Sequence, residues 1–267
     1  MEPLVHLIEA DTVPQAWLKA AEYLSDHYAA YNLVLAVRHP EVLTPADFGI
    51  HDVVDGFLRA HGRPPLTTIA GTIFPANFYL HGGAEELYTY PQIYPKIPSR
   101  WGTYAIRLLR KSTYRRGQGL AEINPLQILV EKMKKQLAGG RLRAVYEANL
   151  VADTDYLELP IYDAECDAGR TRCQPCLSHL SFKLLPGDRV MLTVLYRYHY
   201  YMEKALGNLL GLSQLLYFVA KETGLGVGPL VCHSTYAVLD TEGGWRIGDV
   251  KQLVTACHQQ KQRPQSN

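Results

Sequence analysis

Four side chains that could bind a metal or react as thiols fall within residues 166–179. They are Cys166, Cys173, Cys176 and His179, and the Cys173-Gln-Pro-Cys176 spacing suits a zinc ion. Cys173 and Cys176 could also form a redox pair, although the thioredoxin-type βαβ pattern is missing around them. Alternatively, Cys176 is a nucleophile, or it is buried as most free cysteines are. The spacing alone leaves these four roles open.

Aromatic and basic side chains alternate over residues 196–201, in the sequence YRYHYY. In a strand, successive side chains point to opposite faces. We therefore expect Tyr196, Tyr198 and Tyr200 on one face, and on the other Arg197, His199 and Tyr201. The tyrosine face could line a cleft and stack on a base, or it could pack half-buried in a sheet.

Two further positions carry polar groups whose role depends on the local element. Asn208 stands near the expected start of a helix, where it could simply cap the helix. Cys232 and His233 are adjacent in an expected strand, so they should face opposite sides and should not form a catalytic dyad.

The elements that position these groups follow from hydrophobic periodicity and from turn residues. We expect helices over 11–30, 51–61, 124–140, 205–225 and 248–262. We expect strands over 32–40, 66–74, 156–164, 176–185, 189–202 and 229–239, with Pro160 marking an edge or a bulge. A Pro-Gly-Asp turn joins two of these strands into a hairpin, and residues 80–104 are expected to form a loose segment with three prolines.

This succession of helices and strands predicts an α/β (α+β) protein with a large twisted mixed sheet flanked by helices. A chain of 267 residues can form one such core, and no linker divides it, so we expect a single domain over 1–267. Within it, residues 1–65 form an N-terminal helix and strand region, and a disordered tail is expected within 258–267.

The charge balance, 27 basic and 26 acidic residues, favours neither nucleic acid nor an anionic membrane as a partner. No stretch approaches the length of a membrane span, and no signal peptide is expected. Five cysteines, an odd number in a large chain, argue against a disulfide framework and for reduced thiols. We therefore expect a cytoplasmic protein without a nucleic-acid or membrane partner.

Several motifs over residues 100–240 resemble those of thymidylate synthases in their order and spacing. A Pro-Cys pair ending at Cys176 precedes the hairpin, NLLGLS begins at Asn208 on the long helix, and STY ends at Tyr236 in the next strand. Upstream, WGTY ends at Tyr104 and is followed by Arg107, which is similar to the family's Gly-x-x-Tyr-Gly segment. The chain is also similar to the pyrimidine nucleotide hydroxymethylases of that family.

The resemblance implies one-carbon transfer through a covalent intermediate. Cys176, as a thiolate, would add to C6 of a uracil-type ring and make C5 nucleophilic toward a donor, for which methylene-folate is the family's choice. Asn208 would hydrogen-bond the base edge, Tyr236 would hold the sugar hydroxyl and Tyr104 would assist proton transfer. The resemblance further implies a homodimer formed through the sheet.

Other positions depart from the family pattern. Paired phosphate-binding arginines are replaced by Glu158-Leu159, and a carboxylate there would repel a phosphate. The family has another phosphate-binding arginine on the strand after the cysteine. Aligned from Asn208, this arginine corresponds to Arg197, whereas aligned from Tyr196 it corresponds to Tyr198. We favour Arg197, because a phosphate needs a cation.

The substrate and folate features are also altered. Ser234 stands in place of a family histidine, and the pterin-binding aspartate falls near Tyr200 or Tyr201. Ser234 and His199 complete the residues that we expect to bind substrate. The active-site glutamate has no clear match, and the tail that closes over folate is shortened to about one helix.

The sequence therefore predicts a methyltransferase or hydroxymethyltransferase that acts on a non-standard pyrimidine nucleotide or nucleoside. Two alternatives remain. One is a non-catalytic binding protein built on the same scaffold. The other is a zinc protein that uses the four ligands Cys166, Cys173, Cys176 and His179.

Overall fold

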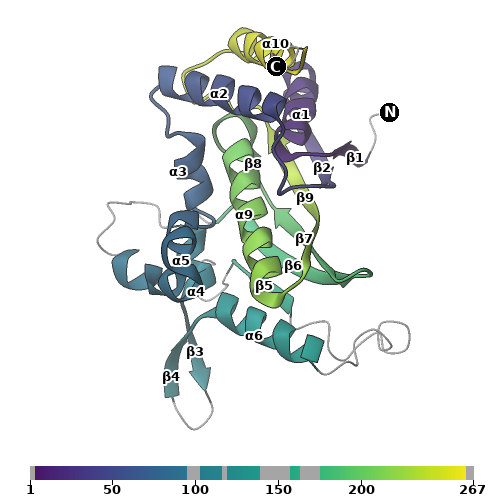
Figure 1. The fold of residues 1–267 in the computed structure, drawn as a ribbon. Coiled ribbons are helices and arrows are strands. Elements are labelled where there is room, and N and C mark those ends of the chain that lie inside the picture. Colours follow the sequence, from purple (N-terminus) through teal and green to yellow (C-terminus); the bar gives the residue numbers. More distant parts are fainter. Residues whose placement is uncertain (1–3, 95–102, 116–118, 139–156, 163–174, 263–267) are drawn as a thin grey trace.

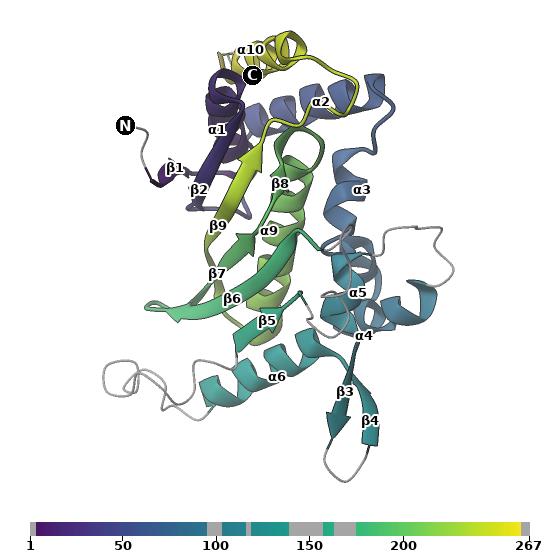
Figure 2. The ribbon, with the colours of Figure 1, turned by 180° about the vertical axis from the view of Figure 1, so that it is seen from behind.

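A mixed sheet of seven strands forms the centre of the molecule, and helices pack against one of its faces (Figure 1). The computed structural model describes residues 4–94, 103–115, 119–138, 157–162 and 175–262. Seen from behind, no described segment covers the opposite face of strands β2, β9, β7 and β6 (Figure 2). The predicted α/β class with a large mixed sheet is confirmed.

The strands follow the order β1-β2-β9-β7-β6-β5, and β8 pairs with β9 outside this path. The β1–β2, β7–β9 and β8–β9 pairs are parallel, whereas β2–β9, β6–β7 and β5–β6 are antiparallel. In sheet order, their bounds are β1 His6–Ala10, β2 Ala29–Val37, β9 Gly226–Val238, β7 Arg189–Tyr196, β6 Leu177–Leu185 and β5 Glu158–Pro160, with β8 at His199–Tyr200. β5 ends the order, as the proline at its end predicts.

The helices and a small separate hairpin complete the described chain. The helices are α1 Val13–His27, α2 Pro45–Ala60, α3 Leu66–Gly71, α4 Ala76–Ile93, α5 Tyr104–Leu109, α6 Pro125–Ala138, α9 Leu206–Thr223, α10 Ile247–Gln262 and the π-helix η3 Tyr201–Ala205. The hairpin pairs β3 Lys111–Arg115 with β4 Gly119–Ile123. Within the described residues, no helix combines the length and the apolarity that crossing a membrane requires.

Helix α9 is the central element of the helical layer, and most of its side chains are buried between the sheet and α3 (Figure 1). Its close approach to α3 depends on small residues. A Cβ added at Gly211 would lie 2.6 Å from the carbonyl oxygen of Ala70, which is closer than real contacts allow. Gly224 ends the helix with a left-handed φ of 74°, as predicted.

Two predictions for the first half of the chain are wrong. Residues 66–74, predicted as a strand, form α3 and a turn, because Leu66, Ile69 and Ile73 are buried at helical spacing despite their β-branched neighbours. Much of 80–104, predicted as a loose segment, belongs to α4. That helix is interrupted at Gly82 and Gly83, which hides its period. Residues 95–102 lie outside the described residues.

Two boundaries also differ from the prediction. Helix α2 begins at Pro45, well before residue 51, because Thr44 caps it. The Thr44 hydroxyl accepts from the Asp47 N–H, and the Asp47 carboxylate accepts from the Thr44 N–H. Helix α10 ends at Gln262, as the prediction of a helix over 248–262 has it, so the start of the predicted tail at residue 258 is wrong because residues 258–262 are helical.

Candidate active site

Cys176 lies directly before β6 and is partly exposed, whereas the other described cysteines, Cys232 and Cys257, are buried. The neighbouring strand end fixes its main chain. The Arg197 N–H donates to the Cys176 carbonyl oxygen at 3.0 Å, and Arg197 Nε donates to the Pro175 carbonyl oxygen at 3.0 Å. Arg197 thus holds both peptide groups that precede the strand.

Tyr104 supports the same segment from helix α5. Its hydroxyl oxygen accepts from the N–H groups of Cys176 and Leu177, at 3.3 Å and 3.4 Å. Thr103 caps the helix by accepting from the Ile106 N–H, which fixes Tyr104 at the first helical position. Burial raises the pKa of Tyr104 to about 12, so the phenol keeps a proton that it can donate to a substrate oxygen.

The thiol itself experiences two opposed influences. Burial raises the pKa of Cys176, and the Arg197 guanidinium lowers it, with a net result above the usual range. The protonated thiol therefore predominates at neutral pH, and a nucleophilic role requires that the proton leave as substrate binds.

Asn208, His199 and Ser234, three predicted substrate-binding residues, form one buried network. Asn208 Nδ2 donates to His199 Nε2 at 3.3 Å, and His199 Nδ1 lies 3.0 Å from Ser234 Oγ. Since an amide nitrogen only donates, Nδ1 carries the imidazole proton and donates to the serine. Burial lowers the pKa of His199 to about 3, so its ring is neutral.

These three side chains contact one another at exposed fractions of only 5% for Asn208, 1% for His199 and 2% for Ser234. Asn208 is not a helix cap, because α9 begins at Leu206 and the cap position is Ala205. Their role in substrate binding stays a prediction.

The predicted alternation over 196–201 is wrong. Strand β7 ends at Tyr196, the chain bends at residues 197–198, and His199 then pairs with Ala237 of β9. Tyr196 and His199 are consequently buried on the same side. The alternation failed because two short strands replace the single long one, and Tyr201 already opens the π-helix η3.

A row of four tyrosine rings runs from this bend to strand β2. The Tyr198 ring lies 4.9 Å from that of Tyr200 and 5.2 Å from that of Tyr236, and the Tyr236 ring lies 5.1 Å from that of Tyr31. We call these four side chains the tyrosine row. The sequence did not indicate Tyr31, because its contact depends on the β2–β9 pairing, which places it opposite Tyr236.

Glu158 is held by a polar cluster at the edge of the sheet. Its carboxylate accepts from Ser181 Oγ at 2.7 Å and from Lys183 Nζ at 2.6 Å, and it lies 2.6 Å from His179 Nε2. Burial raises the pKa of Glu158, but the three hydrogen bonds outweigh burial and leave the pKa below its usual value. The proposed zinc ligand His179 is thus engaged here, while Cys166 and Cys173 lie outside the described residues.

The prediction that Cys232 and His233 face opposite sides is confirmed. Cys232 is buried on the helix-covered face, and His233 Nε2 lies 3.0 Å from Asn32 Oδ1 on the other face. The two residues therefore do not form a dyad.

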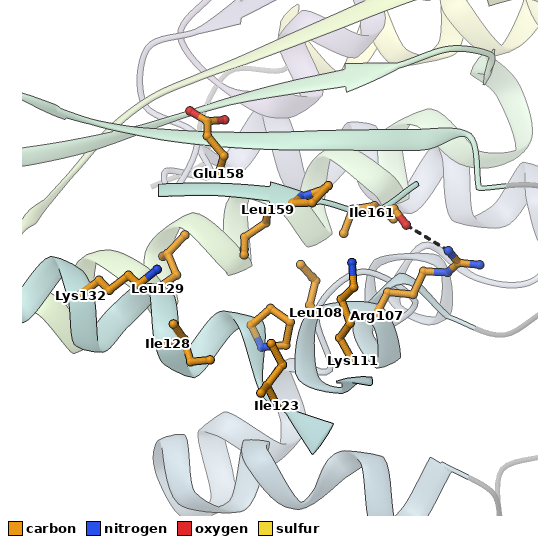
Figure 3. A pocket seen from close by; sticks show the side chains of 12 residues that line it. Arg107, Leu108, Lys111, Ile123, Ile128, Leu129, Lys132, Glu158, Leu159 and Ile161 are labelled. Carbon is orange, nitrogen blue, oxygen red and sulfur yellow. Dashed lines mark hydrogen bonds between the residues drawn. The ribbon is translucent and has the colours of Figure 1, made fainter. Parts of the chain in front are cut away.

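A cavity of about 200 Å³, which Cys176 does not line, lies between α5, α6, the β3–β4 hairpin and β5 (Figure 3). Its wall is apolar apart from three cations, Arg107, Lys111 and Lys132. Arg107 Nη1 donates to the Ile161 carbonyl oxygen at 3.0 Å, and the Glu158 carboxylate points away from the cavity. None of the predicted site residues lines it.

No protein-family model matches the sequence, and no curated protein is significantly similar to it. The functional inference therefore depends on the residues themselves and on how the fold brings them together at Cys176.

Proposed function

We propose that the protein is a thymidylate synthase-like enzyme that transfers a one-carbon unit to C5 of a uracil-type pyrimidine through a covalent Cys176 adduct. One observation carries the proposal. Cys176 is the partly exposed cysteine among those described, with Arg197 acting on its thiol and the Tyr104 hydroxyl bound to its own peptide N–H. The mixed sheet with one helical layer is compatible with that family's fold.

The proposed chemistry begins at the thiol. Cys176 loses its proton, its sulfur bonds to C6 of the ring, and the C5–C6 π electrons move toward the ring carbonyl oxygen. C5 would then bond to the methylene carbon of the donor, and loss of the C5 proton would expel the donor nitrogen to leave an exocyclic methylene group. Addition of water (hydroxymethyl product) or of a hydride from the reduced folate (methyl product) to that group would break the C6–sulfur bond and restore the C5–C6 double bond. Arg197 stabilises the thiolate, and Tyr104 donates to a substrate oxygen or moves a proton at C5.

The other predicted residues have supporting roles in this proposal. Tyr236 contacts the sugar, Arg197 meets a phosphate if the substrate carries one, and the Asn208–His199–Ser234 network orients the base. Methylene-folate is the proposed donor and would supply the carbon.

A mechanism-based adduct tests the proposal. Wild-type protein incubated with 5-fluorouridine or its monophosphate and methylene-folate should gain the combined mass of the pyrimidine and the folate in denaturing mass spectrometry, because the fluorine at C5 cannot leave as a proton does. Cys176→Ser should gain none, whereas Cys257→Ser, which alters a buried cysteine of α10, should behave as wild type. A wild-type protein that forms no adduct with either compound contradicts the proposal.

A second candidate function is a non-catalytic pyrimidine-binding protein. Two observations favour it: the net raised pKa of the Cys176 thiol, and the Asn208 amide directed at His199. It predicts that uridine binds equally to wild type and to Cys176→Ser, and that 5-fluorouridine forms no adduct.

The zinc alternative predicts bound metal in the purified protein, released only on unfolding, and elemental analysis decides it.

The proposed assembly is a homodimer that buries the open sheet face. A line of paired residues crosses this face from strand to strand: Leu7, Val34, His233, Leu195 and His179. Leu7 is 57% exposed, and the others are half-buried. A second copy would cover the apolar side chains of Leu7, Val34 and Leu195. A cytoplasmic location is part of the same proposal, because reduced thiols are needed for the chemistry.

A further inference from the structure

The side chains of the tyrosine row do not belong to the hydrophobic core. Tyr31 is 73% exposed, and Tyr198, Tyr200 and Tyr236 are half-buried, although each ring contacts the next. The rings come from three segments, β2, β9 and the bend with β8. Exposed aromatic rings that gather from separate segments provide stacking surface for a planar ligand group.

The row is connected to the Cys176 site through the backbone of Arg197. The Arg197 N–H donates to the Cys176 carbonyl oxygen, and its own carbonyl oxygen accepts from Thr235 Oγ1 at 2.9 Å. Thr235 precedes Tyr236, and Tyr198 follows Arg197, so the row begins within one residue of this link. The Cys176 thiol also contributes to the raised pKa of Tyr200, so the thiol and this end of the row are neighbours.

Carboxylates accompany the row at the Tyr200 end. Burial is the main reason that the pKa of Tyr200 is raised, and Glu242, Asp240 and Glu203 add to it. Burial and the neighbouring phenols, with Glu242, raise the pKa of Tyr198 to about 12. The charged groups that raise these two pKa values are carboxylates, so they would repel a phosphate bound on the row.

These carboxylates differ in how firmly they are held. Asp240 accepts from the N–H groups of Met202 and Glu203, at 2.7 Å and 3.1 Å. Glu203 pairs with two cations, Lys204 at 2.7 Å and Arg63 at 3.7 Å. Glu242 is exposed. The nearest cation along the chain, Arg197, directs its Nε to Pro175 on the Cys176 side.

We propose that the tyrosine row binds the part of the substrate that lies beyond the reacting ring, and that this part is an uncharged aromatic group. This inference depends on the proposed function for the identity of the reacting ring. It narrows the substrate class to a neutral pyrimidine nucleoside that carries a second planar ring, and it disfavours a 5′-phosphate.

Calorimetry with three probes on the Cys176→Ser protein tests the inference separately from the chemistry. The probes are uridine, uridine 5′-monophosphate and 5′-O-benzyluridine. We expect the benzyl derivative to bind about tenfold more tightly than uridine, the order of one aromatic stacking contact, and the monophosphate to bind less tightly than uridine. Tyr198→Leu should abolish the benzyl advantage, and Tyr198→Phe should keep it.

Matched variants make the test specific. Tyr217→Leu removes an exposed tyrosine of α9 outside the row and should change nothing. Glu242→Gln should strengthen binding of the monophosphate but not of uridine. If Tyr198→Leu unfolds, Tyr31→Leu, which removes the most exposed ring of the row, should reduce the advantage.

Any of four results would overturn the inference. Two concern the benzyl derivative: the monophosphate binds more tightly than it does, or its tighter binding relative to uridine survives Tyr198→Leu or Tyr31→Leu. The other two are an unchanged monophosphate affinity in Glu242→Gln and no binding of any probe. A wild-type protein that stacks the benzyl group but forms no adduct with 5-fluorouridine would refute the proposed catalysis and keep the binding role of the row.

Discussion

The rings of Tyr196 and His199 stack with centroids 4.0 Å apart and planes within 1° of parallel. The contact joins the end of β7 to β8 across the bend, and it buries an imidazole whose two nitrogens are both engaged. The ring must stay neutral there, because a buried imidazolium would lose its hydration and its acceptor nitrogen.

This neutral histidine should make stability depend on pH. The pKa of His199 is about 3 in the folded protein, against about 6.5 in the unfolded chain. Between these values only the unfolded state binds the proton, so stability falls as pH decreases, by about 1.4 kcal/mol per pH unit below pH 6.5. Urea unfolding at pH 7 and pH 5 measures the difference. His199→Gln should lose this part of the slope, whereas exposed His39→Gln should keep it; equal slopes in all three proteins would contradict the assignment.

The crossing of α9 and α3 should tolerate no added methyl group. Gly211→Ala places a Cβ 2.6 Å from the Ala70 carbonyl oxygen and 3.0 Å from Ile73 Cβ. We expect a loss of about 1–3 kcal/mol in the free energy of unfolding, as overpacking generally costs. The control is Gly248→Ala in α10, where a Cβ meets nothing within 4 Å, and thermal unfolding should show it as stable as wild type or more so.

Arg197 should control the reactivity of Cys176. Arg197→Ala removes the guanidinium that lowers the pKa of the thiol, so the pH profile of iodoacetamide alkylation should shift upward. At pH 8 we expect alkylation roughly two- to fivefold slower than in wild type, with Arg197→Lys closer to wild type. Peptide mapping assigns the modified thiol. An unshifted profile in Arg197→Ala would show that the cation does not act on the thiol.

The open sheet face should determine the oligomeric state. Val231 of β9 is half-buried and lies two residues before His233, on the same open face. Val231→Lys places a charge among side chains that the proposed dimer buries, and sedimentation should show a shift toward monomer relative to a dimeric wild type. Thr255→Lys, on the exposed side of α10, adds the same charge elsewhere and should leave the state unchanged. A wild type that is monomeric at all concentrations would refute the dimer.

Sequence periodicity was sufficient for the sheet hairpin and for helices such as α9, because their apolar residues and end glycines agree. It failed for α3, where β-branched residues favour a strand but Leu66, Ile69 and Ile73 pack as a helix. It also failed for the site. The positions of Cys176, Arg197 and Tyr104 depend on hydrogen bonds between segments far apart in the sequence, which no local pattern encodes.

The contact of the row with Tyr31 illustrates the same limit. It exists because β2 and β9 pair in a register that sets Tyr31 opposite Tyr236, and a shift of one residue would remove it. The buried network has a similar origin, since β8 pairs with β9 only after the chain bends at residues 197–198.

The two-sided attachment of Arg197 has a kinetic consequence. The Arg197 N–H donates to the Cys176 carbonyl and the Arg197 carbonyl accepts from the Thr235 hydroxyl, so a displacement of the bend by a ligand moves the residue that bears the sulfur. A molecule that fits the rings poorly would then leave the sulfur misaligned after it had bound. Discrimination between good and poor ligands would appear in kcat more than in KM, since a small error in alignment slows bond formation steeply.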